Sequence, residues 1–458
     1  MADQVMWFRR DLRTADHPAL LAAVSAADGS RVLPLFVLDD ALWGPSGTPR
    51  RDRLVRSLTT LSESLDGALV VRRGRPEDVV PAVAAELGAA AVHVTGDAGP
   101  YGRKRDERVA TALTEAGRDL VVTGSPYAVG PGRVLNGSGS PYQVFTAFHR
   151  AWREHGWPDP APKPAAARWA RAPESDGLPA LEDRDLADLP DHRAEAGEDA
   201  AHSRWVDFLE NRLSGYATAR DRPDLDGTSR MSEHLKWGEV HPRTLLRDLA
   251  GRGGDGARVY SEELGWREFY ADVLWHRPET AREYLRPEYA GMAYDEPGEG
   301  FEAWCAGRTG FPFVDAGMRQ LLELGWIHNR VRMVVASFLV KDLHVEWQHG
   351  ARHFLQHLCD GDLASNNHGW QWVAGSGTDA APYFRIFNPV SQGQKFDPDG
   401  DYVRRFVPEL AHLDGAAAHE PWDVEDGYAH GYPQRIVEHK AERVESLARL
   451  KAMQDARR

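Results

Sequence analysis

The sequence is poor in cysteine and contains no long apolar run. Only Cys305 and Cys359 occur among its 458 residues, so neither a disulfide framework nor a cysteine-based zinc site is expected. The first residues, "MADQVMWFRRDLR", lack the apolar core of a signal peptide, and no stretch reaches the length of a membrane span. These absences predict a soluble protein of the reducing cytoplasm.

Positive charge is also in deficit. The net charge is −14 at pH 7, which argues against a protein that coats nucleic acid over its whole surface. Part of the acidic excess lies in residues 174–199, so a local basic groove elsewhere is still compatible with this total. Tryptophan, in contrast, is abundant: the fifteen copies indicate stacking surfaces or redox chemistry.

The first part of the chain alternates β-rich runs with amphipathic segments of helical length. No G-x-G-x-x-G follows the first β-rich run, so a nicotinamide fingerprint is absent. The expected strands are 4–8, 31–38, 68–73, 90–96 and 118–124, and the expected helices are 16–26, 50–65, 76–87 and 101–116. Asp16 and Pro76 are suited to helix starts. This alternation predicts a doubly wound parallel α/β sheet that binds ligands at the carboxyl ends of its strands.

A chain of this length exceeds the size at which one core keeps growing, so at least two domains are expected. We predict an α/β domain over 1–130, an inter-domain linker over 131–200 and an all-helical domain over 201–458. From about residue 157 the linker is rich in proline, alanine and charge and has no sustained period. The helices expected after it are 205–220, 241–250, 261–275, 314–325, 328–342 and 349–358.

Two clusters in the helical part have both a structural and a ligand-binding interpretation. Thr228, Ser229 and Ser232 lie near a helix start, where hydroxyls and backbone N–H groups either cap the helix or bind phosphate oxygens. Glu263, Trp266 and Arg267 share one helix face by their spacing. They form either an intrahelical ion pair beside a core tryptophan or a site for a planar, hydrogen-bonding ligand.

Two further clusters concern charge and metal. Arg332 precedes an apolar helical run and needs a carboxylate partner if it is buried; "DGD" at 360–362 offers two. Such a pair is either structural or a clamp on a cofactor. His349, His353 and His357 form a stripe on one helix face, but no further ligand is apparent. No metal site is therefore predicted.

The order and wording of several motifs resemble the photolyase and cryptochrome family over nearly the whole chain except the linker. The motifs are "MWFRRDLRTADHPAL", "DGTSRMS", "ELGWREFY", "GWIHNRVRMVVASFLVKDL" and "DGDLASNNHGWQWVAGSGTDAAPYFRIFNPVSQGQKFDPDG". Within the family they look most like the class I cyclobutane pyrimidine dimer photolyases. The resemblance implies an N-terminal α/β domain and a C-terminal helical domain that binds FAD, in agreement with the organisation derived above.

The resemblance also implies site residues. Asn366 would face flavin N5, and Arg332 and Asp360 would form a buried pair beside the flavin ring. The full set implied for FAD is Tyr216, Thr228, Ser229, Arg230, Met231, Ser232, Arg267, Arg332, Asp360, Gly361, Asp362 and Asn366.

The implied activity is light-driven repair of pyrimidine dimers in DNA by electron transfer from excited, reduced FAD to the flipped-out dimer. Trp266 and Trp372 would form an apolar cradle for the dimer, while Glu263 and Asn329 would hydrogen-bond its bases and Met333 would pack between dimer and flavin. Arg220, Arg330 and Gln392 would contact phosphates. Trp304, Trp347 and Trp370 match the family's electron-transfer tryptophans; each is otherwise a packing residue.

Three points of the pattern bear on the choice within the family. Six-four photolyases carry a His-His pair where this chain has His328 and Asn329, which argues against that lesion. A signalling cryptochrome without repair activity is the alternative from a different functional class. His368 and Gly265 depart from the residues common in relatives and bear on the shape of the pocket.

An antenna chromophore and a monomeric state complete the expectations. Asp97 and Lys236 resemble the chromophore contacts of the deazaflavin-binding members, and Arg53 would assist them. The resemblance therefore favours hydroxydeazaflavin over methenyltetrahydrofolate as the antenna. A monomer that binds damaged DNA and no membrane is expected.

Overall fold

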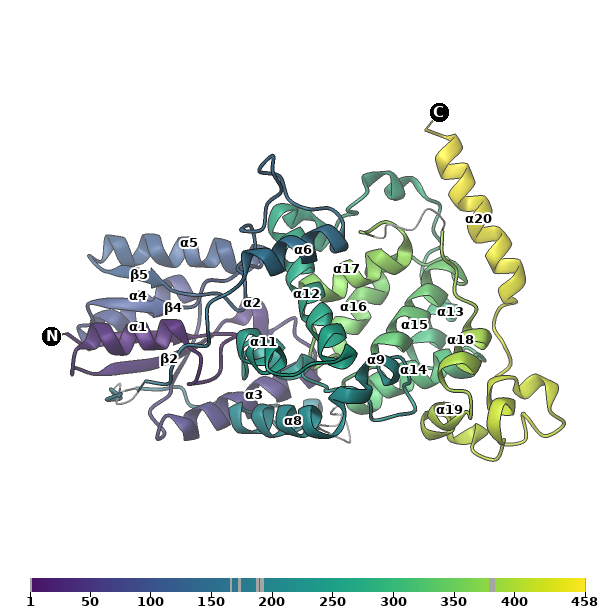
Figure 1. Ribbon diagram of the computed structural model, residues 1–458, viewed down its shortest axis with the longest axis horizontal. Coiled ribbons are helices and arrows are strands. Elements are labelled where there is room, and N and C mark those ends of the chain that lie inside the picture. Colours follow the sequence, from purple (N-terminus) through teal and green to yellow (C-terminus); the bar gives the residue numbers. More distant parts are fainter. Residues whose placement is uncertain are drawn as a thin grey trace. The chain divides into compact units, whose positions relative to one another are not determined.

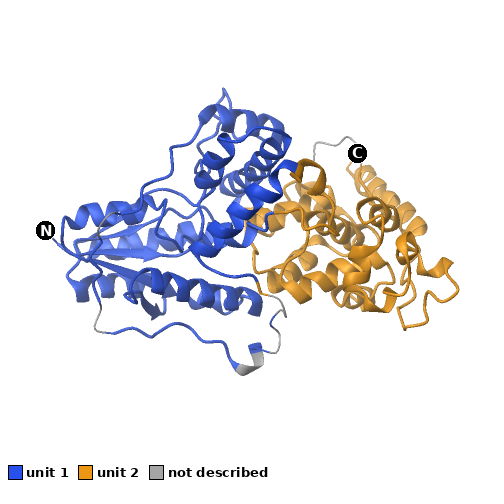
Figure 2. Cartoon of the chain, turned by 60° about the horizontal axis from the view of Figure 1, so that its bottom comes forward, with its two compact units in different colours: residues 1–189, 194–214, 229–278 blue, residues 190–193, 215–228, 279–458 orange. Residues whose placement is uncertain are grey.

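The structure is a computed structural model, and it describes residues 2–164, 167–171, 174–186, 189, 193–378 and 384–457. The chain forms two compact units (Figure 2). The first comprises Met1–Leu189, Ala194–Ser214 and Ser229–Pro278. The second comprises Pro190–Arg193, Gly215–Thr228 and Glu279–Arg458.

The first unit is built on a five-stranded parallel sheet, which confirms the predicted fold class. Its strands are β1 (Gln4–Phe8), β2 (Val32–Leu38), β3 (Val70–Arg73), β4 (Ala91–Val94) and β5 (Asp119–Val122), in the order β3-β2-β1-β4-β5. All residues of β1 and β2 are buried, because helices cover both faces of a doubly wound sheet. The covering helices include α1 (Pro18–Ala27), α3 (Thr48–Ser64), α4 (Pro76–Leu87) and α5 (Pro100–Glu115) (Figure 1).

One predicted helix start is confirmed and the other is wrong. Pro76 is the first residue of α4, as expected for a side chain that fixes φ and needs no N–H partner. Asp16 does not cap α1: His17 does, and its Nδ1 accepts a hydrogen bond from Leu20 N at 3.2 Å. Asp16 instead accepts a hydrogen bond from Arg243 at 2.6 Å, so its carboxylate serves a tertiary contact.

The described part of the first unit has further α-helices. They are α2 (Asp40–Trp43), α6 (Phe145–His155), α7 (Asp183–Leu186), α8 (Glu198–Asn211), α10 (Ser232–Trp237), α11 (Pro242–Ala250) and the long α12 (Asp255–His276). The helix α6 lies inside the predicted linker, where it buries Phe148 and Trp152. Beyond it the chain is mostly irregular, and its residues 168–170 hydrogen-bond to Val32 at β2.

The second unit is helical, as predicted. It contains α9 (Tyr216–Ala219), α13 (Glu299–Cys305), α14 (Pro312–Leu324), α15 (Asn329–Lys341), α16 (Trp347–His357), α17 (Leu363–Ala374), α18 (Pro389–Phe396), α19 (Asp401–Phe406) and α20 (His439–Asp455). The centre of its core is formed largely by α14 and α15, whose residues are mostly buried. No described helix is both long and apolar enough to cross a bilayer.

The two compact units divide the chain at other places than the predicted domains. Residues 229–278, placed in the helical domain by the sequence, pack with the α/β sheet. Buried polar contacts explain this: Glu268 on α12 accepts hydrogen bonds from the backbone of Ala128 and Val129 at 2.7 and 2.9 Å. Burial raises the pKa of Glu268 to about 7. The assignment of binding functions to the predicted domains stays a prediction.

Candidate functional site

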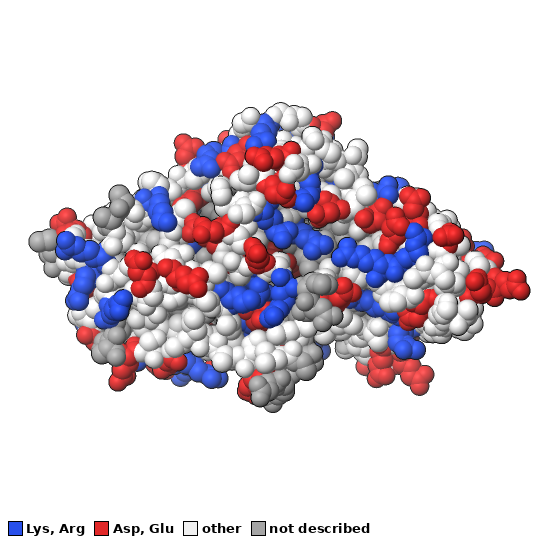
Figure 3. Space-filling model, turned by 90° about the horizontal axis from the view of Figure 1, so that it is seen from below, with Lys and Arg blue, Asp and Glu red and all other residues white. Residues whose placement is uncertain are grey.

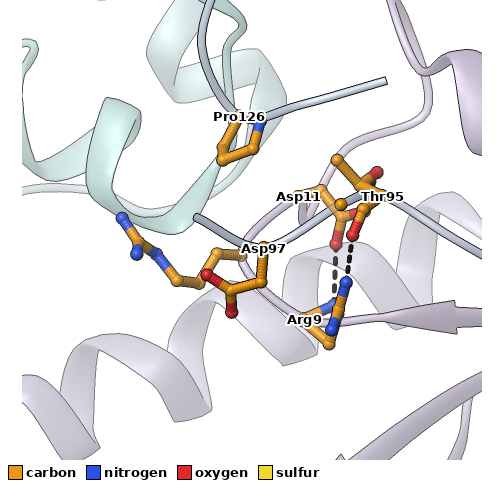
Figure 4. Close-up of a pocket in the computed structure, with 7 residues that line it drawn as sticks. Arg9, Asp11, Thr95, Asp97 and Pro126 are labelled. Atoms are coloured by element: carbon orange, nitrogen blue, oxygen red, sulfur yellow. Dashed lines mark hydrogen bonds between the residues drawn. The ribbon is translucent and has the colours of Figure 1, made fainter. Parts of the chain in front are cut away.

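A pocket lies at the carboxyl ends of β1 and β4. It is lined by Arg9, Arg10, Asp11, Thr95, Gly96, Asp97 and Pro126 (Figure 4). The strand order reverses its winding direction between β1 and β4, and open α/β sheets bind ligands at such a switch point. The pocket is partly open to solvent, and its empty space of about 240 Å³ includes some of that solvent. It is therefore a half-open depression at the ligand-binding edge of the sheet.

The pocket wall carries fixed charges of both signs. The Asp97 carboxylate accepts hydrogen bonds from Gly99 N at 3.0 Å and Arg105 at 3.2 Å. Burial opposes its ionisation, but Arg105, Arg9 and Arg10 outweigh burial and lower the pKa of Asp97 to about 2. A Cβ on Gly102 would lie 2.1 Å from Asp97 Oδ2, so glycine at this position of α5 is what lets the carboxylate lie there.

Of the three predicted antenna residues, Asp97 lines this pocket. Lys236 lies on α10, and its carbonyl accepts a hydrogen bond from Arg10, a pocket residue, at 3.5 Å. Arg53 is fully buried and donates to the carbonyls of Ala194 and Glu195 and to Glu239 at 2.6–3.0 Å. The structure thus gives Arg53 a structural place, where it joins α3 to the linker and to the end of α10. It does not line the pocket.

The predicted phosphate-binding cluster falls at the start of α10. Ser232 is the first helical residue, and no side chain caps the helix. The Ser229 hydroxyl accepts a hydrogen bond from Met231 N at 3.2 Å and shares one with the Tyr260 hydroxyl at 2.7 Å. Arg230 has a positive φ of 52°, which turns the chain sharply before α10. Tyr216, at the start of α9, is buried, and Thr228 lies directly before the turn.

The three residues predicted to share a helix face lie on α12, as expected. Trp266 is half-buried and stacks face to face on Phe145 of α6, with ring centroids 3.7 Å apart and an interplanar angle of 9°. The Arg267 guanidinium donates to the carbonyls of Pro126 and Leu235 at 3.1 and 3.4 Å. Glu263 is half-buried one turn before Trp266. Phe145 was not foreseen, since nothing in its local sequence points to Trp266.

The stack on Trp266 accounts for Gly265. His149 also stacks on Phe145, with ring centroids 5.3 Å apart. A Cβ on Gly265 would lie 2.7 Å from Cδ2 of His149. Glycine therefore makes room for His149, whose ring packs against Phe145, the residue that stacks on Trp266.

The predicted arginine–carboxylate pair forms in the second unit. Arg332 Nη2 donates to Asp360 Oδ2 at 2.9 Å and Oδ1 at 3.2 Å, and Arg332 Nε donates to the carbonyl of Ile327 at 2.8 Å. Asp362 caps α17 by accepting from Ser365 N at 3.1 Å. Gly361 separates the two acids, so one carboxylate pairs with Arg332 while the other starts the next helix.

Asn366 on α17 is buried and oriented by its own helix and by α16. Its Nδ2 donates to the carbonyl of Ala351 at 3.1 Å and to Asn367 Oδ1 at 2.9 Å. Both amide hydrogens are thereby used, and no described residue donates to Oδ1. The Oδ1 atom of Asn366 is therefore left as an unused hydrogen-bond acceptor, which fits a ligand ring that presents an N–H.

Trp370 and Trp372 lie on opposite sides of α17. Trp370 is 3% exposed and contacts Trp304 with centroids 6.1 Å apart. Trp372 is half-buried, with the Arg385 guanidinium 5.1 Å from its ring. Trp347 on α16 is fully buried in the same core. One helix thus places Trp370 inside the core and Trp372, partly exposed, at the margin of the same core.

The position of Trp370 depends on Gly350 of α16. A Cβ on Gly350 would lie 2.2 Å from Cη2 of Trp370. We expect Gly350→Ala to displace the indole and to lower the free energy of unfolding by about 1–3 kcal/mol, the usual cost of overpacking. Urea unfolding followed by tryptophan fluorescence measures this.

The matched control is Gly369→Ala on α17, where no atom lies within 4 Å of the added Cβ. In a helix interior this change is expected to be neutral or to stabilise by up to about 1 kcal/mol. Equal effects of the two substitutions would show that Gly350 does not set the position of Trp370.

Two histidines of the second unit, His353 and His368, have pKa values that burial lowers. His368 on α17 is fully buried, and its Nε2 lies 3.0 Å from Oγ1 of Thr280, far earlier in the chain. Burial lowers its pKa to about 4. Burial also lowers the pKa of His353 to about 3. Among the described residues no group of three or more His, Cys, Asp or Glu side chains is placed to hold a metal ion.

The residues predicted to contact DNA and the lesion differ in accessibility. Asn329 is exposed at the start of α15, and Arg220, Met333 and Gln392 are half-buried. Arg330 pairs with Asp221 at 2.9 Å, so part of its charge is already neutralised. Figure 3 shows basic side chains in small groups among acidic ones on one face. Small basic groups of this kind fit the expectation of local phosphate contacts in a chain whose net charge is −14.

The fold is that of a protein with a parallel α/β part and a helical part that pairs a buried carboxylate with an arginine. The model for the FAD binding domain of DNA photolyase matches residues 260–452, and the DNA photolyase model matches residues 4–166. A deoxyribodipyrimidine photo-lyase of Streptomyces griseus is 40% identical over 448 residues, 96% of this chain and 97% of the relative. The chain belongs to the DNA photolyase family.

Two solved structures resemble the whole chain. A bacterial class III photolyase from Agrobacterium tumefaciens has a TM-score of 0.91 and 37% identity, covering 99% of this chain and 98% of that one. An archaeal photolyase from Sulfolobus tokodaii, solved with two FAD molecules, has a TM-score of 0.86 and 28% identity over 98% of this chain and 100% of that one. The architecture of this chain is thus that of photolyases.

Proposed function

We propose that this protein is a deoxyribodipyrimidine photo-lyase that repairs cyclobutane pyrimidine dimers in DNA with light, and that it is of class I. Near full-length similarity to enzymes of that name supports the activity. The observation that carries the proposal is helix α17. It brings an oriented amide, a core tryptophan and a half-buried tryptophan together at Asn366, Trp370 and Trp372.

The proposed FAD site uses the cluster from Tyr216 to Ser232, together with Arg267, Arg332, Asp360, Gly361, Asp362 and Asn366. These residues fit FAD for two reasons. Asn366 has one acceptor atom left for a flavin N–H, and the Arg332 side chain, which Asp360 holds in place, is 26% exposed and so can contact a ligand. When bound, reduced and excited by light, FAD supplies the electron that opens the cyclobutane ring. The chain itself supplies binding, orientation and a site shielded from water.

The proposed task of Trp266 and Trp372 is to hold the lesion. A damaged dinucleotide that leaves the duplex exposes apolar base faces, and damaged bases cost least to extrude. Trp266, backed by Phe145, and Trp372 would stack on these faces. Glu263 and Asn329 would bind the polar edges, and Met333 would pack between dimer and flavin.

Phosphates around the extruded nucleotides would be held by Arg220, Arg330 and Gln392. The ion pair of Arg330 with Asp221 has to open or reorient for a phosphate contact. A small number of such contacts predicts a shallow dependence of DNA affinity on salt.

The antenna proposal rests on the pocket at the sheet. Asp97, Arg9 and Arg10 offer an acceptor and donors to a polar heterocycle, which supports hydroxydeazaflavin over methenyltetrahydrofolate. We also propose that the protein is monomeric and cytoplasmic.

The deciding experiment exposes the chemically reduced protein, loaded with FAD, to blue light together with an oligonucleotide that contains one thymine dimer. We expect intact thymines to be recovered, as measured by chromatography of the digested product. A dark sample and an oligonucleotide with a six-four lesion serve as controls. Failure to restore thymines from the dimer under light would refute the proposed activity and favour a signalling role.

A further inference from the structure

The three tryptophans assigned to electron transfer are all buried. Trp304 and Trp347 are 0% exposed and Trp370 is 3% exposed. A reductant in solution cannot touch any of them in this conformation. An electron path that starts at the surface therefore needs a further redox-active side chain between one of these indoles and solvent.

Tyr284, itself 5% exposed, contacts Trp347 and lies beside the half-buried residues Tyr294 and Glu346. Its ring meets the Trp347 indole edge to face, with centroids 6.2 Å apart and an interplanar angle of 80°. Its hydroxyl donates a hydrogen bond of 2.6 Å to Glu346 Oε1. Tyrosine and tryptophan in ring contact can exchange an electron rapidly if the phenolic proton has an acceptor, because an oxidised phenol is strongly acidic.

Glu346 is well placed as that acceptor. It directly precedes Trp347 as the N-cap residue of α16, yet its side chain makes no capping hydrogen bond. Its carboxylate bonds to the Tyr284 phenol instead, within the distance that proton transfer requires. Glu346 is half-buried, so a proton that it accepts can pass to water.

The surroundings of Tyr284 keep its phenol protonated in the resting protein. Burial, the neighbouring phenol of Tyr294 and the Glu346 carboxylate raise the pKa of Tyr284 far above its ordinary value. Tyr294 stacks beside it, with centroids 6.5 Å apart and an interplanar angle of 11°, and is half-buried. The pair extends from the core indole towards the surface.

We propose that Tyr284 is a further redox residue, which donates an electron to Trp347 and its phenolic proton to Glu346. The inference rests on the proposed function, because the oxidant is light-excited, oxidised FAD acting through the tryptophans. The Trp347 radical cation gains one electron and becomes neutral indole. Tyr284 loses one electron and one proton and becomes a neutral tyrosyl radical, while the Glu346 carboxylate becomes a carboxylic acid. An external one-electron reductant, acting at the half-buried Tyr294 side of the pair, then returns the electron, and Glu346 returns the proton, which restores the tyrosine and the carboxylate.

The first test follows radicals by transient absorption and by electron paramagnetic resonance of flash-frozen samples, after blue light on protein loaded with oxidised FAD. In the unmodified protein we expect the tryptophan radical to decay as a tyrosyl radical rises. In Tyr284→Phe the tyrosyl signal should be lost and the tryptophan radical should persist until it recombines. The control is Tyr402→Phe, which removes another buried hydroxyl. That hydroxyl donates to Gln320 at 2.9 Å, and the Tyr402 ring meets two phenylalanines edge to face. This variant should behave like the unmodified protein.

The second test addresses the proton. Glu346→Gln should slow the rise of the tyrosyl radical by roughly 100-fold or more, the lower range for loss of a positioned general base. Deuterated water should slow the rise in the unmodified protein as well. A tyrosyl signal that survives Tyr284→Phe, or an unmodified protein that shows no tyrosyl radical, would overturn the proposal.

Repair activity separates this inference from the function on which it rests. Protein reduced chemically beforehand needs no electron from the tryptophans, so Tyr284→Phe should restore thymines at the unmodified rate. Radical results that contradict the relay, together with intact repair, would remove Tyr284 alone. Absence of repair in the unmodified protein would remove the proposed function.

Discussion

Replacing Asp360 by alanine is expected to destabilise the helical unit by about 3 kcal/mol. The substitution leaves the Arg332 guanidinium without its carboxylate, and breaking a buried pair from one side costs about 3–5 kcal/mol. The lower end applies because the Arg332 side chain is 26% exposed, whereas that of Asp360 is 3% exposed. Urea unfolding followed by circular dichroism measures the change, and a titration with FAD should show weaker binding.

Asp362→Ala is the matched control for stability. It removes an acid two residues away whose carboxylate caps α17, and loss of an N-cap costs about 1 kcal/mol. Asp360→Asn, which keeps an acceptor for Arg332, should lie between the two. Equal destabilisation by Asp360→Ala and Asp362→Ala would contradict a special role for the Arg332–Asp360 pair.

The second large effect concerns Trp372. We expect Trp372→Ala to weaken binding to dimer-containing DNA by about 1–3 kcal/mol, the range for a lost stacking platform, or roughly 5- to 150-fold. Affinity for undamaged DNA should change little, because phosphate contacts dominate there. Fluorescence anisotropy with the two oligonucleotides measures the difference.

Trp370→Phe is the control for this prediction. It alters a tryptophan on the same helix that faces the core, so it should leave the affinity for damaged DNA unchanged. A loss of affinity that is equal for damaged and undamaged DNA would show that Trp372 supports the fold and does not cradle the lesion.

Prediction from the sequence was most successful where local pattern decides structure. All five strands were predicted because each is a short β-rich run, although only β1 and β2 are buried along their whole length. The helix α17 could not be found by periodicity, because its buried side includes Asn366, Asn367, His368 and Gln371. These polar groups are satisfied by partners such as Thr280 and Ala351, which no local pattern reveals.

The site shows the same division. Local reasoning predicted that Arg332 would pair with Asp360 or Asp362, the resemblance to photolyases implied Asp360, and the structure has the Asp360 pair. The structural role of Arg53 was not predicted, because its partners Ala194 and Glu239 are more than a hundred residues away in the chain. Arg9 and Arg10 could have been found, since residues that follow a parallel strand line its ligand-binding edge.

The sequence by itself determined the α/β and helical parts, the resemblance to photolyases and most of the residues assigned to FAD and DNA. Tertiary structure alone decided that residues 229–278 belong to the same compact unit as the sheet, that Phe145 stacks on Trp266, and that Tyr284 contacts both Trp347 and Glu346. The physical reason is that burial and proton acceptors are set by neighbours distant in the chain. A phenol becomes a candidate redox group only when folding places an indole on one side of it and a carboxylate on the other.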